Sequence, residues 1–173
     1  MCACITGEEL LGIVAKQEQM LRFESFTNEE ALSIGVQIAQ LARDSERPIA
    51  LRIYRNDIVV FQYCMEGKEK SHLRWTERKH HTVCATGHST MYARILVKCL
   101  DDRSVFDGAP DDVTVGTGGF PLVVGGELVG SICVSGLVDP GDHLLIVRAL
   151  AEYLHRDVPP LPERVEMGWL PSM

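Results

Sequence analysis

Residues 116–136 read GTGGFPLVVGGELVGSICVSG, and this stretch decides the fold. Two apolar, β-branched runs flank Gly125 and Gly126, a pair in which both residues can take the positive φ of a tight hairpin turn. The stretch holds more glycine than a hairpin needs. Glycine inside a strand weakens it, and usually marks a bulge or a place where a ligand or another backbone comes close. The sequence therefore predicts a β-hairpin with a binding site beside it.

A second hairpin is predicted earlier in the chain. Apolar runs at 49–55 and 58–65 flank Asn56 and Asp57, two residues that tolerate left-handed turn geometry. Helical signals occupy most of the rest: Thr6 and Thr27 each begin a capping box, and we expect helices over 6–20, 27–45, 71–84, 89–100 and 140–155. For the last helix, Asp139 is the expected N-cap and Pro140 the first helical residue.

The order of elements is helices, hairpin, helices, hairpin, helix. Hairpins dictate antiparallel pairing, so the expected fold class is α+β, with helices covering an antiparallel sheet of four or five strands. We expect one domain over 1–173, made of N-terminal helices (6–46), a core sandwich (48–155) and an extended tail (156–173). We expect a polar loop at 101–112, before the glycine-rich hairpin.

Composition limits the partners. The chain has 173 residues and a formal net charge of −7, which disfavours nucleic acid and anionic membranes as partners. It has no secretory signal and no apolar run of about 18 residues or more, so we predict a cytoplasmic protein. The six cysteines form no C-x-x-C pair, which favours reduced thiols. Cys2 and Cys4 could bind a soft metal, but they lack partner ligands, so we interpret them as part of a frayed end.

A basic segment at 68–82 is the second candidate site. It holds five Lys or Arg residues against two Glu in an otherwise acidic chain. On a helix, Trp75, Arg78 and Lys79 share one face, which offers a flat apolar surface with anion-binding groups at its edge. Such a face suits an aromatic carboxylate or an acidic partner. The alternative is a tryptophan anchored in the core beside a solvated basic face.

Patterns typical of catalysis are weak. Gly116 and Gly118 precede a strand rather than a helix, which excludes a dinucleotide fingerprint. Asp142 and His143 are consecutive on a predicted helix, so their side chains diverge and do not form a triad with Ser135. His88 is a candidate axial haem ligand, or simply a hydrogen-bonded surface histidine. We therefore predict no catalytic residues and no assigned metal ligand, and the chain is more consistent with a non-enzyme.

Several motifs together resemble the GlcG/HbpS-like family, whose members are often described as haem-degrading-domain proteins. They are W-x-x-R-K at 75–79, Val83, Ser89, GGFP at 118–121, Gly130, VSG at 134–136 and Asp142. The resemblance implies a profilin-like α/β/α sandwich around an antiparallel sheet. It also implies self-association, since relatives form homo-oligomers, and haem as a cofactor to test, since some relatives bind it.

Two functions remain open. The first is a non-catalytic module that binds a small anionic ligand, such as a tetrapyrrole carboxylate. The second is a homo-oligomeric assembly protein with no small ligand, in which the helix of Trp75 lies near a subunit boundary. For the first, the candidate ligand-binding residues are Trp75, Arg78, Lys79, Ser89, Gly118, Gly119, Phe120, Pro121, Ser135 and Gly136.

Overall fold

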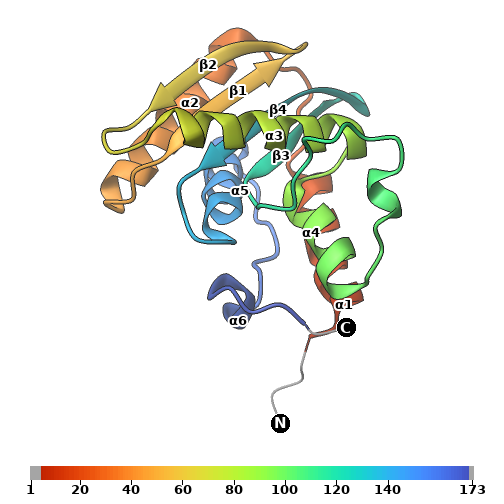
Figure 1. Cartoon of the computed structure of the whole chain (residues 1–173). Coiled ribbons are helices and arrows are strands. Elements are labelled where there is room, and N and C mark those ends of the chain that lie inside the picture. The colour runs from red at the N-terminus through yellow and green to blue at the C-terminus, as the bar shows by residue number, and fades with distance from the viewer. Residues whose placement is uncertain (1–4, 172–173) are drawn as a thin grey trace.

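The structure is a computed structural model, and it describes residues 5–171 (Figure 1). The major elements follow the predicted order. They are α1 (Gly7–Met20), α2 (Asn28–Asp44), β1 (Ala50–Arg55), β2 (Ile58–Cys64), α3 (Lys70–Thr86), α4 (Thr90–Cys99), β3 (Gly119–Val124), β4 (Glu127–Ser135) and α5 (Gly141–Leu154). Both N-terminal helices carry the capping boxes that Thr6 and Thr27 predict. Gly87 ends α3 with a φ of 72°.

The four strands form one antiparallel sheet in the order β2-β1-β4-β3. Each predicted hairpin is present, and its turn residues have the positive φ that a tight turn needs: Asn56, Asp57, Gly125 and Gly126. The hairpins join through β1 and β4, which place Ala50 opposite Ser135 and Arg55 opposite Gly130. The α+β fold class is therefore confirmed, with four strands.

The two faces of the sheet differ in chemistry because side chains alternate along a strand. Ile53, Phe120 and Ile132 point to one face, where α2 and α5 complete the main apolar core. The other face is crossed by α3 (Figure 1) and carries polar and small residues, including Ser131, Ser135 and Gly119. The sheet therefore has an apolar side and a side that can hold polar groups.

The start of α5 differs from the prediction. The N-cap is Pro140 and the helix begins at Gly141, so Asp139 does not cap it. The Asp139 carboxylate instead accepts hydrogen bonds from the backbone and the hydroxyl of Thr117, and pairs with Arg94 at 3.1 Å. The local pattern assigns the Asp139 carboxylate to a helix cap, but in the structure this carboxylate makes tertiary contacts instead.

The C-terminal segment also differs from the extended tail expected over 156–173. A short helix, α6 (Glu163–Glu166), forms within it, and Leu161 and Val165 are buried. They join Leu10 and Met91 in a second apolar cluster beside α1 and α4. The segment thus helps to cover this helix pair. No helix in the described part of the chain is both long and apolar enough to cross a membrane.

Candidate ligand-binding site

The buried side of α3 is unusually polar for a helix that packs on a sheet. Its buried residues are Thr76, Lys79, His80, Thr82 and Val83, of which only Val83 is apolar. The shortage of apolar residues noted in the sequence therefore reflects a polar interface between helix and sheet. Polar groups remain buried only when they are hydrogen-bonded, so each of them needs a partner in the strands or loops.

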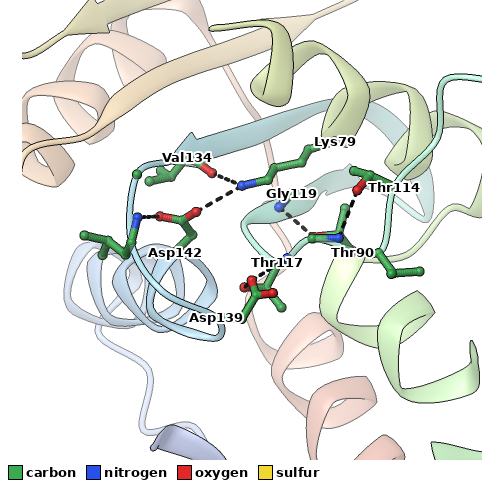
Figure 2. A network of polar contacts seen from close by, with 12 residues as sticks. Lys79, Thr90, Thr114, Thr117, Gly119, Val134, Asp139 and Asp142 are labelled. Atoms are coloured by element: carbon green, nitrogen blue, oxygen red, sulfur yellow. Dashed lines mark hydrogen bonds and ion pairs between the residues drawn. The ribbon is translucent and has the colours of Figure 1, made fainter. Parts of the chain in front are cut away.

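Lys79 finds its partner on α5. Its Nζ lies 3.0 Å from Asp142 Oδ2 and donates to the carbonyl of Val134 at 2.6 Å (Figure 2). The other carboxylate oxygen of Asp142 accepts from the backbone of Leu137 at 3.0 Å. Both side chains are about 96% buried. Burial raises the pKa of Asp142, and the Lys79 ammonium opposes that rise.

The glycines at 118 and 119 make this close packing feasible. A Cβ on Gly118, whose φ is +105°, would lie 2.4 Å from the Cβ of Asp142. A Cβ on Gly119 would lie 2.8 Å from Thr90 and 3.1 Å from the Lys79 backbone oxygen. The Gly119 amide donates to the Thr90 hydroxyl at 2.9 Å (Figure 2). These two glycines therefore let α3, α4 and α5 approach the start of β3.

A pocket of about 380 Å³ opens where α3 meets the end of β4. Its lining comes from five segments: α3, Gly116 in the loop before β3, the end of β4, the loop into α5, and the first turn of α5. The lining residues are Ser71, His72, Trp75, Lys79, Gly116, Ser135, Gly136, Leu137, Asp139 and Asp142. This volume lies at the small end of the roughly 300–1,000 Å³ typical of ligand sites.

Trp75 supplies the flat surface of the pocket. Its side chain is 42% exposed, and the Arg78 guanidinium carbon lies 4.6 Å from its ring centroid. Arg78 also donates to the carbonyls of Asp112 and Val113, which fixes it in place. Lys68 flanks the pocket: its Nζ donates to the Gly136 carbonyl at 3.2 Å, and no carboxylate pairs with it within residues 5–171.

The structure brings some predicted site residues together and leaves others apart. Trp75, Lys79, Ser135 and Gly136 line the pocket, with Gly118 and Gly119 directly behind Lys79. Lys79 is an ion-pair partner of Asp142 rather than a free cation. Outside the lining are Arg78, Ser89, Phe120 and Pro121.

Their positions explain what these outlying residues do. Phe120 is fully buried in the main core, and Pro121 lies opposite Ser131 in the sheet. Ser89 caps α4 by accepting from the Tyr92 amide at 3.1 Å. Glycine-rich strands thus mark the neighbourhood of the pocket, but not every residue of the GGFP motif faces it.

His88 does not line the pocket. Its Nδ1 lies 2.7 Å from Glu18, and its ring stacks on Tyr92 with a centroid distance of 4.0 Å. This arrangement is that of a hydrogen-bonded histidine, which was the alternative to the interpretation of His88 as a haem ligand. His72 lies in the pocket instead, and its Nδ1 accepts from the Glu69 amide as part of the α3 cap. No pattern in the sequence separates His72 from the other histidines.

Other residues have positions that the sequence left open. His143 is fully buried and bonds Gln17 at 3.0 Å, far from any role beside Ser135. The four described cysteines, at 64, 84, 99 and 133, are free thiols. Cys2 and Cys4 lie outside the described residues.

A larger groove of about 710 Å³ runs along α1, lined by Ile5, Ile13, Met20 and Pro159 among others. Its aliphatic residues are accompanied by the charged residues Glu9, Lys16 and Asp157, and the groove lies away from the polar face of the sheet. Ligand sites combine apolar walls with a few convergent polar groups. Both cavities have that combination, but only the pocket beside Trp75 adds an aromatic ring and the predicted residues Lys79, Ser135 and Gly136, so it is the better candidate site.

The fold and the pocket define an α+β sandwich with a polar site on the α3 face of its antiparallel sheet. The sequence model of the family described as "Haem degrading protein HbpS-like" matches residues 26–151. A UPF0303 protein of Psychromonas ingrahamii is 32% identical over 151 residues, covering 85% of this chain and 92% of its own. The chain belongs to the HbpS-like family, as the motifs at 75–79, 118–121 and 134–136 predict.

Solved structures show the same fold. The crystal structure of the Ybr137w protein superposes with a TM-score of 0.75 at 21% identity, covering 84% of this chain and 87% of that one. The crystal structure of a PduOC:Heme complex superposes with a TM-score of 0.63 at 16% identity, covering 73% and 94%. At these identities the likeness establishes the architecture.

Proposed function

We propose that this chain is a non-catalytic binding protein for a flat, anionic, partly apolar ligand, and that haem is the first tetrapyrrole to test. One observation carries the proposal: Trp75 is half exposed at the pocket with the Arg78 guanidinium over its ring, and the Lys68 ammonium bonds Gly136 in the pocket lining. A pocket with an aromatic ring and two cations beside it matches a planar ligand with carboxylates at its edge. The family description and the haem complex of a structural neighbour support haem as the test case.

The pocket residues are compatible with haem. His72 uses Nδ1 in the α3 cap, so its Nε2 is available to an iron atom, and histidine is a common axial ligand. Lys68 and Arg78 would hold the propionates, and Trp75 would cover one edge of the macrocycle. When bound, haem supplies a redox-active iron; the residues of this chain hold and orient it. Because the pocket is small, much of a macrocycle would project beyond it.

The state of the charged groups favours binding over catalysis. Lys79 and Asp142 neutralise each other, and Asp139 is held by Arg94 and Thr117. A general acid or base must reach the substrate in the right protonation state. Each of these groups is instead held by an ion pair or a hydrogen bond within the protein. Lys79, Asp139 and Asp142 therefore form a fixed part of the pocket lining.

The test is a titration with haemin, and in parallel with iron-free protoporphyrin, monitored by absorbance and by Trp75 fluorescence in a Trp169→Phe background. We expect saturable binding of one ligand per chain. Trp75→Ala, or Lys68→Ala with Arg78→Ala, should weaken both ligands about tenfold or more, which corresponds to roughly 1.4 kcal/mol or more. His72→Ala should weaken haemin but leave protoporphyrin unchanged, because only haemin has iron to ligate.

A matched control is available because a second cation–π pair exists elsewhere. Arg164 lies 4.7 Å from the ring centroid of Trp169, near the C-terminus. Arg164→Ala and His88→Ala should therefore leave binding unchanged. Unsaturable haemin uptake that is equal in wild type and in the Trp75→Ala variant would refute the proposal and favour the assembly alternative.

We further propose that the protein is a cytoplasmic homo-oligomer. Four free thiols among the described residues suit a reducing compartment. The edge strand β2 leaves Ile58, Val59 and Tyr63 exposed, and such an edge can pair with another copy. Light scattering at micromolar concentration tests this: a single species near 19 kDa, the mass of one chain, would contradict it.

A further inference from the structure

Three metal-ligating side chains meet on the α3 face at the opposite end of β4 from the pocket. Asp57 lies in the β1–β2 turn, and His80 and Cys84 are one helical turn apart on α3. Their ligand atoms all lie within 4.8 Å of one another. Ser131, which contacts His80, is four residues from Ser135 in the pocket, or about 13 Å along a strand. The cluster is therefore separate from the candidate ligand site.

The distances match the edges of a tetrahedral metal site. His80 Nε2 lies 3.5 Å from Asp57 Oδ1 and 3.6 Å from Cys84 Sγ. Ordinary zinc bond lengths at tetrahedral angles place nitrogen about 3.4 Å from oxygen and about 3.6 Å from sulfur. Cys84 Sγ is also 3.7 Å from His80 Nδ1, so the exposed thiol would turn toward Nε2 to complete the set.

The imidazole of His80 is held in an orientation that suits a ligand. Its Nδ1 hydrogen-bonds the Ser131 hydroxyl at 2.9 Å, and its ring stacks on Tyr54 with a centroid distance of 3.8 Å. A partner on Nδ1 fixes the ring and favours a lone pair on Nε2, which is how proteins usually support a metal-bound histidine. Nε2 then faces the Asp57 carboxylate.

The charge state of His80 also suits a metal. Burial lowers its pKa, so the imidazole is neutral at neutral pH, although the nearby Asp57 carboxylate opposes this shift. The Cys84 thiol would release its proton on binding a metal. Asp57 adds the negative charge that a divalent cation attracts.

We propose that Asp57, His80 and Cys84 bind one zinc ion, with the fourth tetrahedral position open to water. A thiolate, an imidazole and a carboxylate form a donor set that favours zinc over magnesium or calcium, which prefer oxygen ligands. Asp57 is 88% exposed, so the site opens to solvent and has an entry path. Ser131 is a positioning residue that acts through His80.

The experiment uses the full chain, freed of any affinity tag, with Cys2→Ser and Cys4→Ser to remove the two N-terminal thiols. Equilibrium dialysis should show one Zn²⁺ bound per chain. Asp57→Asn and Cys84→Ser should each weaken binding at least tenfold, and Ser131→Ala should weaken it by about tenfold or more. Co²⁺ should give a thiolate-to-metal charge-transfer band that Cys84→Ser abolishes.

The variants are chosen to keep the fold. Asp57 has a φ of 60°, and asparagine tolerates that conformation; Cys84 is exposed, so serine changes little else. The matched control is Asp112→Asn, which removes the carboxylate 2.6 Å from the neighbouring His81. It should leave zinc binding unchanged. No stoichiometric uptake, or uptake that Asp57→Asn and Cys84→Ser leave unchanged, would overturn the proposal.

Discussion

The ion pair between Lys79 and Asp142 gives the sharpest test of how this site is built. Lys79→Met keeps the length of the side chain but removes the ammonium. Asp142 then remains as a buried carboxylate with a hydrogen bond from the Leu137 amide and no counter-charge. Breaking a buried pair in this way costs about 3–5 kcal/mol of unfolding free energy. We expect a loss of that size in urea denaturation at pH 7.5.

The pH dependence identifies the cause of that loss. In the variant, the opposing effect of Lys79 is gone and burial alone raises the pKa of Asp142. A carboxyl whose pKa is raised in the folded state stabilises the fold while protonated, and that stabilisation is lost as pH rises through its folded pKa. Lys79→Met should therefore recover stability on acidification from pH 7.5 toward 5, relative to wild type.

Two further variants complete the cycle. Lys79→Met with Asp142→Asn is neutral and retains an acceptor for the Leu137 amide, so it should lie within about 2 kcal/mol of wild type. Arg148→Met breaks the exposed pair with Glu152 and should cost at most about 1 kcal/mol. A Lys79→Met variant no less stable than Arg148→Met would refute the reasoning.

Two more predictions concern packing and burial. Gly119→Ala should lower the free energy of unfolding by about 1–3 kcal/mol because its Cβ meets Thr90 and Lys79, whereas Gly12→Ala, with nothing within 4 Å, should be neutral or stabilising in chemical denaturation. Equal melting temperatures for the two variants would contradict the close approach. Burial lowers the pKa of His143 to about 4 from 6.5. The unfolded state then binds more protons between these values, so stability should fall by about 3 kcal/mol as pH drops from 6.5 to 4, and His143→Gln should flatten that curve.

Local sequence determined the elements of this fold. The capping boxes at Thr6 and Thr27, the turn residues at 56–57 and 125–126, and the stop at Gly87 each act within a few residues, so a pattern can reveal them. Together with the motifs at 75–79 and 118–121, they were enough to predict the α+β class and the family.

The sequence also predicted a site beside Gly118 and Gly119, where the structure has a pocket, but it did not predict the ion pair that Lys79 makes. Helical spacing put Lys79 beside Trp75 as an anion-binding cation. It could not show that Asp142, 63 residues away, neutralises it inside the protein. The polar character of α3 was visible in the sequence as a shortage of apolar residues. The residues of β4 that contact α3 could not be identified from the sequence.

Only the tertiary structure decided which distant side chains meet. Asp139 binds Thr117 rather than capping α5, and His72 enters the pocket while His88 bonds Glu18. Asp57 approaches His80 of α3 from the β1–β2 turn. None of these contacts follows from spacing along the chain, because the strand order β2-β1-β4-β3 brings together residues that are remote in sequence. Helix caps and turns depend on residues a few positions apart, so a sequence pattern reveals them. A site assembled from α3, β4 and the loop into α5 depends on how the chain packs.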